Sequence, residues 1–252
     1  MSLILEEVDL EKLNFKLNEY YHQFPLRWEE QKYLWKSVRT FQENWNLDAA
    51  DMAGMIDRAT SDADYLIESN GYHPRKIFRS LIEVDRQGVR EIFENLFDES
   101  QDIIKRFGAF ESMIEDLRLG HEYKPYLSRK ESSAYPVIAS TFLWLMYPDR
   151  YYFYKYSVAK KVASATGICF IDDTDSGHKM DSWFKLLDRV SRSLLEDIRF
   201  RQLLDDRLDE TMYRDEKMHC MAIDFAFYIR PLYEGRKGGS KAKISGNSIV
   251  SM

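Results

Sequence analysis

The sequence predicts a mainly α-helical protein, folded as an irregular multi-helix bundle. Glycine and proline are scarce, with 11 and 6 among 252 residues, which favours helices over a turn-rich β fold. Apolar residues recur at spacings of three and four through most of the chain, as they do along the buried face of a helix. Hydrophobic residues make up 44% of the chain, enough for a substantial core. One or two short strands, near residues 168–171 and 221–229, stay open as alternatives to helix.

The first quarter of the chain shows helical periodicity. Residues 1–26 are expected to form a lead-in helix that Pro25 ends, because proline lacks the backbone N–H that a helix interior needs. Residues 28–45 follow with an apolar stripe whose members are spaced by four, three and four. Asp48 is placed to cap a further helix over residues 49–57.

The most regular helical pattern lies between residues 88 and 117, where apolar residues recur over about eight turns. Gly108 is the candidate kink in this region. Farther along, residues 180–198 are typical of another long amphipathic helix, which could extend to Leu208.

The middle of the chain combines an apolar run with a cluster of aromatic and basic residues. The apolar run follows Pro136, a residue suited to the first turn of a helix, and predicts a helix buried on all sides. After the break at Pro148, five aromatic residues occupy six positions, and a short helix capped by Ser157 is expected to stop at Gly167. The aromatic residues are Tyr151, Tyr152, Phe153, Tyr154 and Tyr156, and the interleaved or following cations are Arg150, Lys155, Lys160 and Lys161.

This cluster has two interpretations. Aromatic rings that alternate with cations could stack on bases and pair with phosphates. Tyrosine rings also pack in protein cores with their hydroxyls at the rim, so a core corner is the alternative. The sequence does not determine which way the residues between Tyr151 and Tyr156 face.

We divide the chain into two helical units. Residues 1–118 form the N-terminal unit, the polar residues 119–134 connect it, and residues 135–233 form the aromatic-rich unit. Residues 234–252 form a basic tail rich in glycine and serine, which is expected to be flexible.

Composition limits the environment and the class of function. The formal net charge of −6 means that any nucleic-acid contact would be a local patch on an acidic protein. Cys169 and Cys220 in a chain without a recognisable signal peptide fit a reducing cytoplasm, with both thiols expected to be buried. No segment is long and apolar enough to predict a membrane span.

No catalytic or cofactor-binding motif was found in the sequence. The glycines near the C-terminus lack the spacing of a phosphate-binding loop. The acidic stretch from Asp172 to Asp175, followed by His178, does not keep the register of a calcium loop and predicts a solvated loop. The histidines show no pairing at a spacing of four that would place two metal ligands on one helix face. We therefore expect a protein that is not an enzyme and has no cofactor or metal.

Three stretches resemble a known family. They are residues 28–45, residues 91–100 and residues 141–155, and the likeness extends over roughly residues 25–200. These stretches are similar to the helical N-terminal region that precedes the AAA+ motor in McrB-like proteins of modification-dependent restriction systems. The resemblance implies a region that recognises the DNA target, while a motor, absent here, hydrolyses nucleotide and a separate subunit cuts.

Two classes of function follow. The first is a non-catalytic DNA-target-recognition or regulatory module, with an AAA+ motor and a nuclease subunit as partners and with Arg150, Tyr152, Tyr154, Lys155, Lys160 and Lys161 as the residues expected to contact DNA. The second is a protein-interaction or oligomerisation module without a nucleic-acid role. An exposed basic and aromatic face would favour the first, and an exposed apolar patch without positive charge would favour the second.

Overall fold

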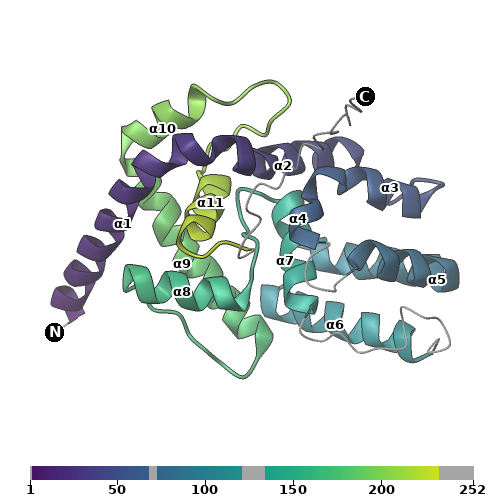
Figure 1. Ribbon diagram of the computed structural model, residues 1–252. Helices are drawn as coiled ribbons and strands as arrows, with labels where there is room; N and C mark the ends of the chain where they lie inside the picture. Colours follow the sequence, from purple (N-terminus) through teal and green to yellow (C-terminus); the bar gives the residue numbers. More distant parts are fainter. Residues whose placement is uncertain (1, 68–72, 121–133, 233–252) are drawn as a thin grey trace, which may run out of the picture.

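The computed structural model of the protein describes residues 2–67, 73–120 and 134–232 (Figure 1). Within these residues it has eleven α-helices, one 3-10 turn and no strand, which confirms the mainly α-helical, multi-helix prediction. The elements are α1 (Ser2–Gln31), α2 (Tyr33–Asn44), α3 (Met52–Ala59), η1 (Ser61–Ala63), α4 (Asp64–Ile67), α5 (Pro74–Phe97), α6 (Ile103–Leu119), α7 (Tyr135–Met146), α8 (Tyr156–Thr166), α9 (Ser176–Glu196), α10 (Ile198–Asp205) and α11 (His219–Ile229).

Two helices lie inside the bundle and organise the others. Helix α7 is buried at nearly every position, as its unbroken apolar sequence predicts, and it packs against α2, α4, α5, α6 and α9. Helix α11 is buried from His219 to Phe227 and lies against α1, α8 and α9. The remaining helices surround these two, with α5 and α6 side by side at one end of the molecule and α1 crossing the other (Figure 1).

A buried polar contact joins the first helix to the last. The carboxylate of Asp224 on α11 is fully buried and accepts hydrogen bonds from the Tyr20 hydroxyl and the Arg27 guanidinium, both at 2.8 Å. Because α1 also packs on α8, helices from both predicted units share one hydrophobic core. The division of the chain into two units stays a prediction, and most of the connector and the whole tail lie outside the described residues.

The expected end of the first helix at Pro25 is wrong, because α1 continues through it to Gln31. Phe24 and Trp28, on either side of Pro25, are both buried, whereas Pro25 itself is exposed. Core packing therefore keeps the helix together, and the backbone hydrogen bond that proline cannot make is lost on the solvent side. Figure 1 shows that α1 changes direction along its length.

Caps move two other predicted boundaries. Asp51, not Asp48, caps α3 by accepting a hydrogen bond from the Gly54 N–H at 2.9 Å, and Asp48 pairs with Arg90 instead. The regular region 88–117 is interrupted at residues 98–102, where Asp102 caps α6, so Gly108 lies inside a helix and makes no kink. The break was missed in the sequence because the apolar spacing of three and four continues from one helix into the next.

The second half of the chain brings three more differences. Residues 168–171 have no regular structure, and residues 221–229 belong to α11, so neither alternative strand forms. The alternation in 221–229 misleads because the residues between the large apolar ones are also buried. Asp197 divides the predicted long helix into α9 and α10 by capping the latter. Lys155, not Ser157, is the N-cap of α8, whereas Gly167 ends that helix as predicted, with a left-handed φ of 77°.

Candidate nucleic-acid interface

The tyrosine cluster between α7 and α8 faces the core. The side chains of Tyr152 and Tyr154 are 0% and 3% exposed. The Tyr152 hydroxyl donates to Asp188 on α9 at 2.9 Å, and the Tyr152 ring stacks on His219 with a centroid distance of 4.2 Å. The Tyr154 backbone N–H donates to the Ser140 hydroxyl of α7 at 2.9 Å. The segment is therefore held by three helices and fills the space between them.

Base stacking needs an open ring face, and neither Tyr152 nor Tyr154 has one in this structure. Burial raises the pKa of both hydroxyls well above the usual value for tyrosine, so each remains protonated. These contacts match the core-corner interpretation of the cluster. The stacking role predicted for the two rings has no support in their positions.

Arg150 lies apart from the other predicted cations. Its side chain is exposed, and its guanidinium pairs with Glu99, between α5 and α6, at 2.8 Å. Glu99 also accepts a hydrogen bond from the Tyr151 hydroxyl at 3.1 Å, and Tyr151 in turn accepts one from the buried Arg106 at 2.5 Å. Arg150 thus belongs to a polar network that connects residues 150–151 to α6 and to the turn between α5 and α6.

Lys155 precedes α8 and is half-buried. Burial, with a contribution from the nearby positive charge of Arg230, lowers the pKa of the Lys155 ammonium. A nearby anion would stabilise the charged form of such a lysine. Lys155 thus lies at the edge of the α8 surface, close to a second cation.

Helix α8 presents a surface of cationic and hydroxyl-bearing side chains. Val158, Ala159, Val162 and Thr166 face the core, and the sequence of the helix contains no acidic residue. The exposed positions, which we call the α8 face, are Tyr156, Ser157, Lys160, Lys161 and Ser164. They span adjacent turns on one side of the helix, and of the predicted residues only Lys160 and Lys161 belong to them.

Two residues of this surface, Tyr156 and Lys179, were not among those expected from the sequence to contact DNA. Tyr156 is 41% exposed, the most open aromatic ring of the cluster. The ammonium groups of Lys160 and of Lys179 on α9 lie 5.4 and 5.3 Å from its ring centroid, within the range of a cation–π contact. The spacing of four between Tyr156 and Lys160 was a usable signal in the sequence. Lys179 could be placed only once the start of α9 was known to lie close to Tyr156.

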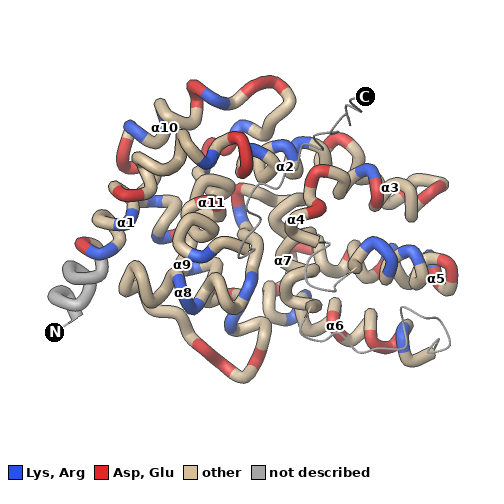
Figure 2. Tube along the Cα trace, viewed as in Figure 1, with Lys and Arg blue, Asp and Glu red and all other residues tan. Residues whose placement is uncertain are grey.

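An acidic loop lies next to the α8 face. In Figure 2 it is the red stretch between α8 and α9. Asp172 in this loop accepts a hydrogen bond from the Tyr156 hydroxyl at 2.7 Å and pairs with the Lys160 ammonium at 3.3 Å. The Tyr156 hydroxyl and then the Lys160 charge hold the pKa of the Asp172 carboxyl below its usual range. Lys161 makes no ion pair with any residue that the structure describes.

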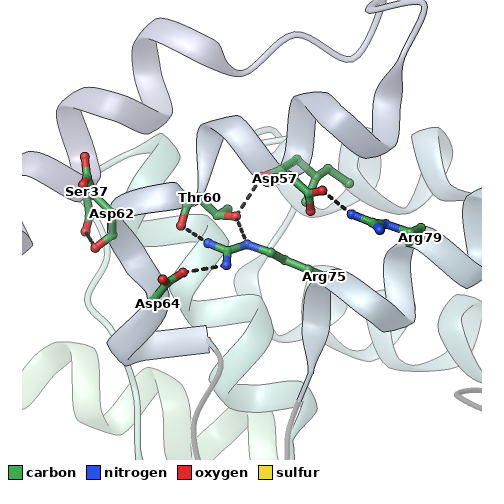
Figure 3. Close-up of polar contacts among 8 residues, drawn as sticks. Ser37, Asp57, Thr60, Asp62, Asp64, Arg75 and Arg79 are labelled. Atoms are coloured by element: carbon green, nitrogen blue, oxygen red, sulfur yellow. Dashed lines mark hydrogen bonds and ion pairs between the residues drawn. The ribbon is translucent and has the colours of Figure 1, made fainter.

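The arginines of α5 form the other concentration of positive charge, and structural contacts occupy them. Arg75 donates to the Thr60 hydroxyl at 2.8 Å, to the Thr60 carbonyl and to Asp64, and Arg79 pairs with Asp57 (Figure 3). These contacts bind α5 to the segment that runs from α3 to α4. Phosphate binding by these arginines would require breaking them, so the α8 face is the better candidate.

Cys220 is buried, as predicted, whereas Cys169 is exposed, so the prediction for that thiol is wrong. The described part of the chain contains no group of three acidic, histidine or cysteine residues able to hold a metal ion. None of its helices combines the length and the apolar character needed to cross a membrane.

The chain matches no protein-family model, and no curated protein and no solved structure matches it significantly. The similarity to McrB-like N-terminal regions therefore stays a prediction.

Proposed function

We propose that this protein is a non-catalytic DNA-recognition module that contacts the DNA backbone through the α8 face. The observation that carries the proposal is the absence of any acidic residue from α8 together with the exposure of Lys160 and Lys161. Lysine ammonium and serine hydroxyl groups are the usual partners of phosphate oxygens. Although Lys160 pairs with Asp172 of the neighbouring loop, this helix surface offers a local positive site on a chain whose net charge is −6.

The resemblance to McrB-like proteins supports the same function from the sequence. A restriction system of that kind would supply an AAA+ motor and a nuclease subunit that act together with this module. The module would then work by binding, and a cytoplasmic location would follow from its contact with DNA.

The test is the salt dependence of binding to a labelled DNA duplex, unmodified and methylated. Each lysine that pairs with a phosphate contributes about 0.9 to the slope of log K against log salt concentration. The double variant Lys160→Ala/Lys161→Ala is expected to weaken binding and to reduce this slope by about 1.8. The matched control is Lys105→Ala/Lys185→Ala, which removes the same charge from exposed positions on α6 and α9.

Equal losses in the two double variants would show that binding follows overall charge and not the α8 face. No binding at low salt by the folded wild-type protein would reject the proposal. Tighter binding of methylated than of unmodified duplex would support the link to modification-dependent restriction.

A second candidate function, protein interaction, rests on apolar side chains of α1. Phe15 and Leu26 are 62% and 78% exposed, and their separation of eleven residues places them on the same side of the helix, three turns apart. A second copy of the chain or a partner could cover them. Light scattering of the wild type and of Phe15→Ser/Leu26→Ser tests self-association: a dimer that the double variant dissociates would support it, and a wild-type monomer at high concentration would exclude it.

A further inference from the structure

The α8 face contains an anion site that the protein fills with its own carboxylate. The Asp172 carboxylate accepts a hydrogen bond from the Tyr156 hydroxyl at 2.7 Å and pairs with the Lys160 ammonium at 3.3 Å. The ammonium of Lys179 lies over the ring of Tyr156 and adds a second positive charge. These groups come from α8 and from the first turn of α9. Asp172 belongs to the loop between these helices, so the occupant and the site are linked through a short segment.

We propose that Asp172 is an internal competitor of DNA, and that a backbone phosphate takes the place of its carboxylate on Tyr156, Lys160 and Lys179. This inference rests on the proposed function and assigns the ligand of one part of the α8 face. A phosphodiester carries one negative charge and oxygen acceptors, so it can accept the same hydrogen bond and satisfy the same ammonium group. Asp172 is exposed, so a rotation of its side chain can free Tyr156 and Lys160 while the core residue Ile168 of the same loop stays in place.

Competition of this kind has a measurable consequence. While Asp172 holds Lys160, DNA must displace the carboxylate before the lysine can pair with a phosphate. An exposed ion pair is weak, so removing it should tighten binding only about two- to fivefold. The salt slope should stay close to the wild-type value, since Lys160 pairs with a phosphate in both complexes.

The matched pair of variants is Asp172→Asn and Asp173→Asn. Both remove one negative charge from the same loop, but Asp173 contacts His178 and the Asp175 N–H, and not Tyr156 or Lys160. Binding of the labelled duplex is measured for both across a range of salt concentrations. We expect Asp172→Asn to bind more tightly than Asp173→Asn, and we expect the added substitution Lys160→Ala to abolish the difference.

Each outcome separates this inference from the proposed function. If the wild type binds through Lys161 but the two aspartate variants behave alike, the internal competitor is rejected and the DNA-binding function stands. If Asp172→Asn binds the duplex more tightly than the wild type and Asp173→Asn does not, the competitor is supported. If neither protein binds the duplex at low salt, both proposals fall.

Discussion

Asp215 makes the stability of the protein dependent on pH. This carboxylate is fully buried before α11, where one oxygen accepts a hydrogen bond from the Met221 N–H at 2.9 Å and the other has no partner. Burial raises the pKa of Asp215 from 3.8 to about 6, against the opposing effect of the N–H groups at the start of α11. Because the folded-state pKa lies above the unfolded one, the protonated group favours folding below pH 3.8, and this contribution is lost as pH rises through 6.

The size of the effect follows from the two pKa values. Between pH 5 and pH 8 the free energy of unfolding should fall by about 1.4 kcal/mol on account of this group. The variant Asp215→Asn keeps an oxygen that can accept from Met221 but cannot ionise, so it should lack this part of the pH dependence. Urea unfolding followed by tryptophan fluorescence at several pH values measures the difference between the two proteins.

The other titratable groups contribute the same pH dependence to both proteins, so their contribution cancels in that comparison. The control is Asp206→Asn, which removes an exposed carboxylate at the end of α10 and should retain the wild-type dependence. An Asp215→Asn protein with an unchanged fall in stability from pH 5 to pH 8 would refute the argument. A carboxyl-carbon NMR titration of the wild type provides a direct second reading of the same pKa.

Three further variants test the packing. Tyr152→Phe removes a buried hydroxyl and should lower the free energy of unfolding, measured with urea, by roughly 1–2 kcal/mol. The affinity for DNA, measured by duplex titration, should stay unchanged. Weakened DNA binding by a folded variant would contradict the buried position of Tyr152. Asp224→Ala leaves Tyr20 and the Arg27 charge without their shared acceptor and should cost about 3–5 kcal/mol, so a loss below 1 kcal/mol would argue against the buried ion pair. Gly167→Ala places a side chain at a φ of 77° and should lower the stability by about 1 kcal/mol, and an unchanged melting temperature would exclude that conformation.

The sequence predicts features that depend on local chemistry. The apolar run after Pro136 forms the buried helix α7, and Gly167 ends α8, because neither feature depends on distant residues. Pro25 and Asp48 show where local rules fail. Packing of the flanking Phe24 and Trp28 carries α1 through the proline, and an equally good cap three residues later, Asp51, takes the place of Asp48.

The candidate site was only partly predictable for a different reason. Tyrosine suits both a core and a binding surface, so the sequence could not show that Tyr152 is enclosed by His219 and Asp188, residues far along the chain. The exposure of Lys160 and Lys161 follows from the sequence of α8, because Val158, Ala159 and Val162 take the core-facing positions. The contact of Lys179 with Tyr156 depends on how α8 and α9 meet, which no local pattern encodes.

The salt dependence of duplex binding by Lys160→Ala/Lys161→Ala tests the central claim most directly, because it counts the phosphate contacts that α8 makes. We expect a slope about 1.8 lower than that of the wild type, with the Lys105→Ala/Lys185→Ala control close to the wild-type value. A slope that is unchanged in the α8 variant, or reduced as much in the control, would contradict the assignment of DNA binding to this helix.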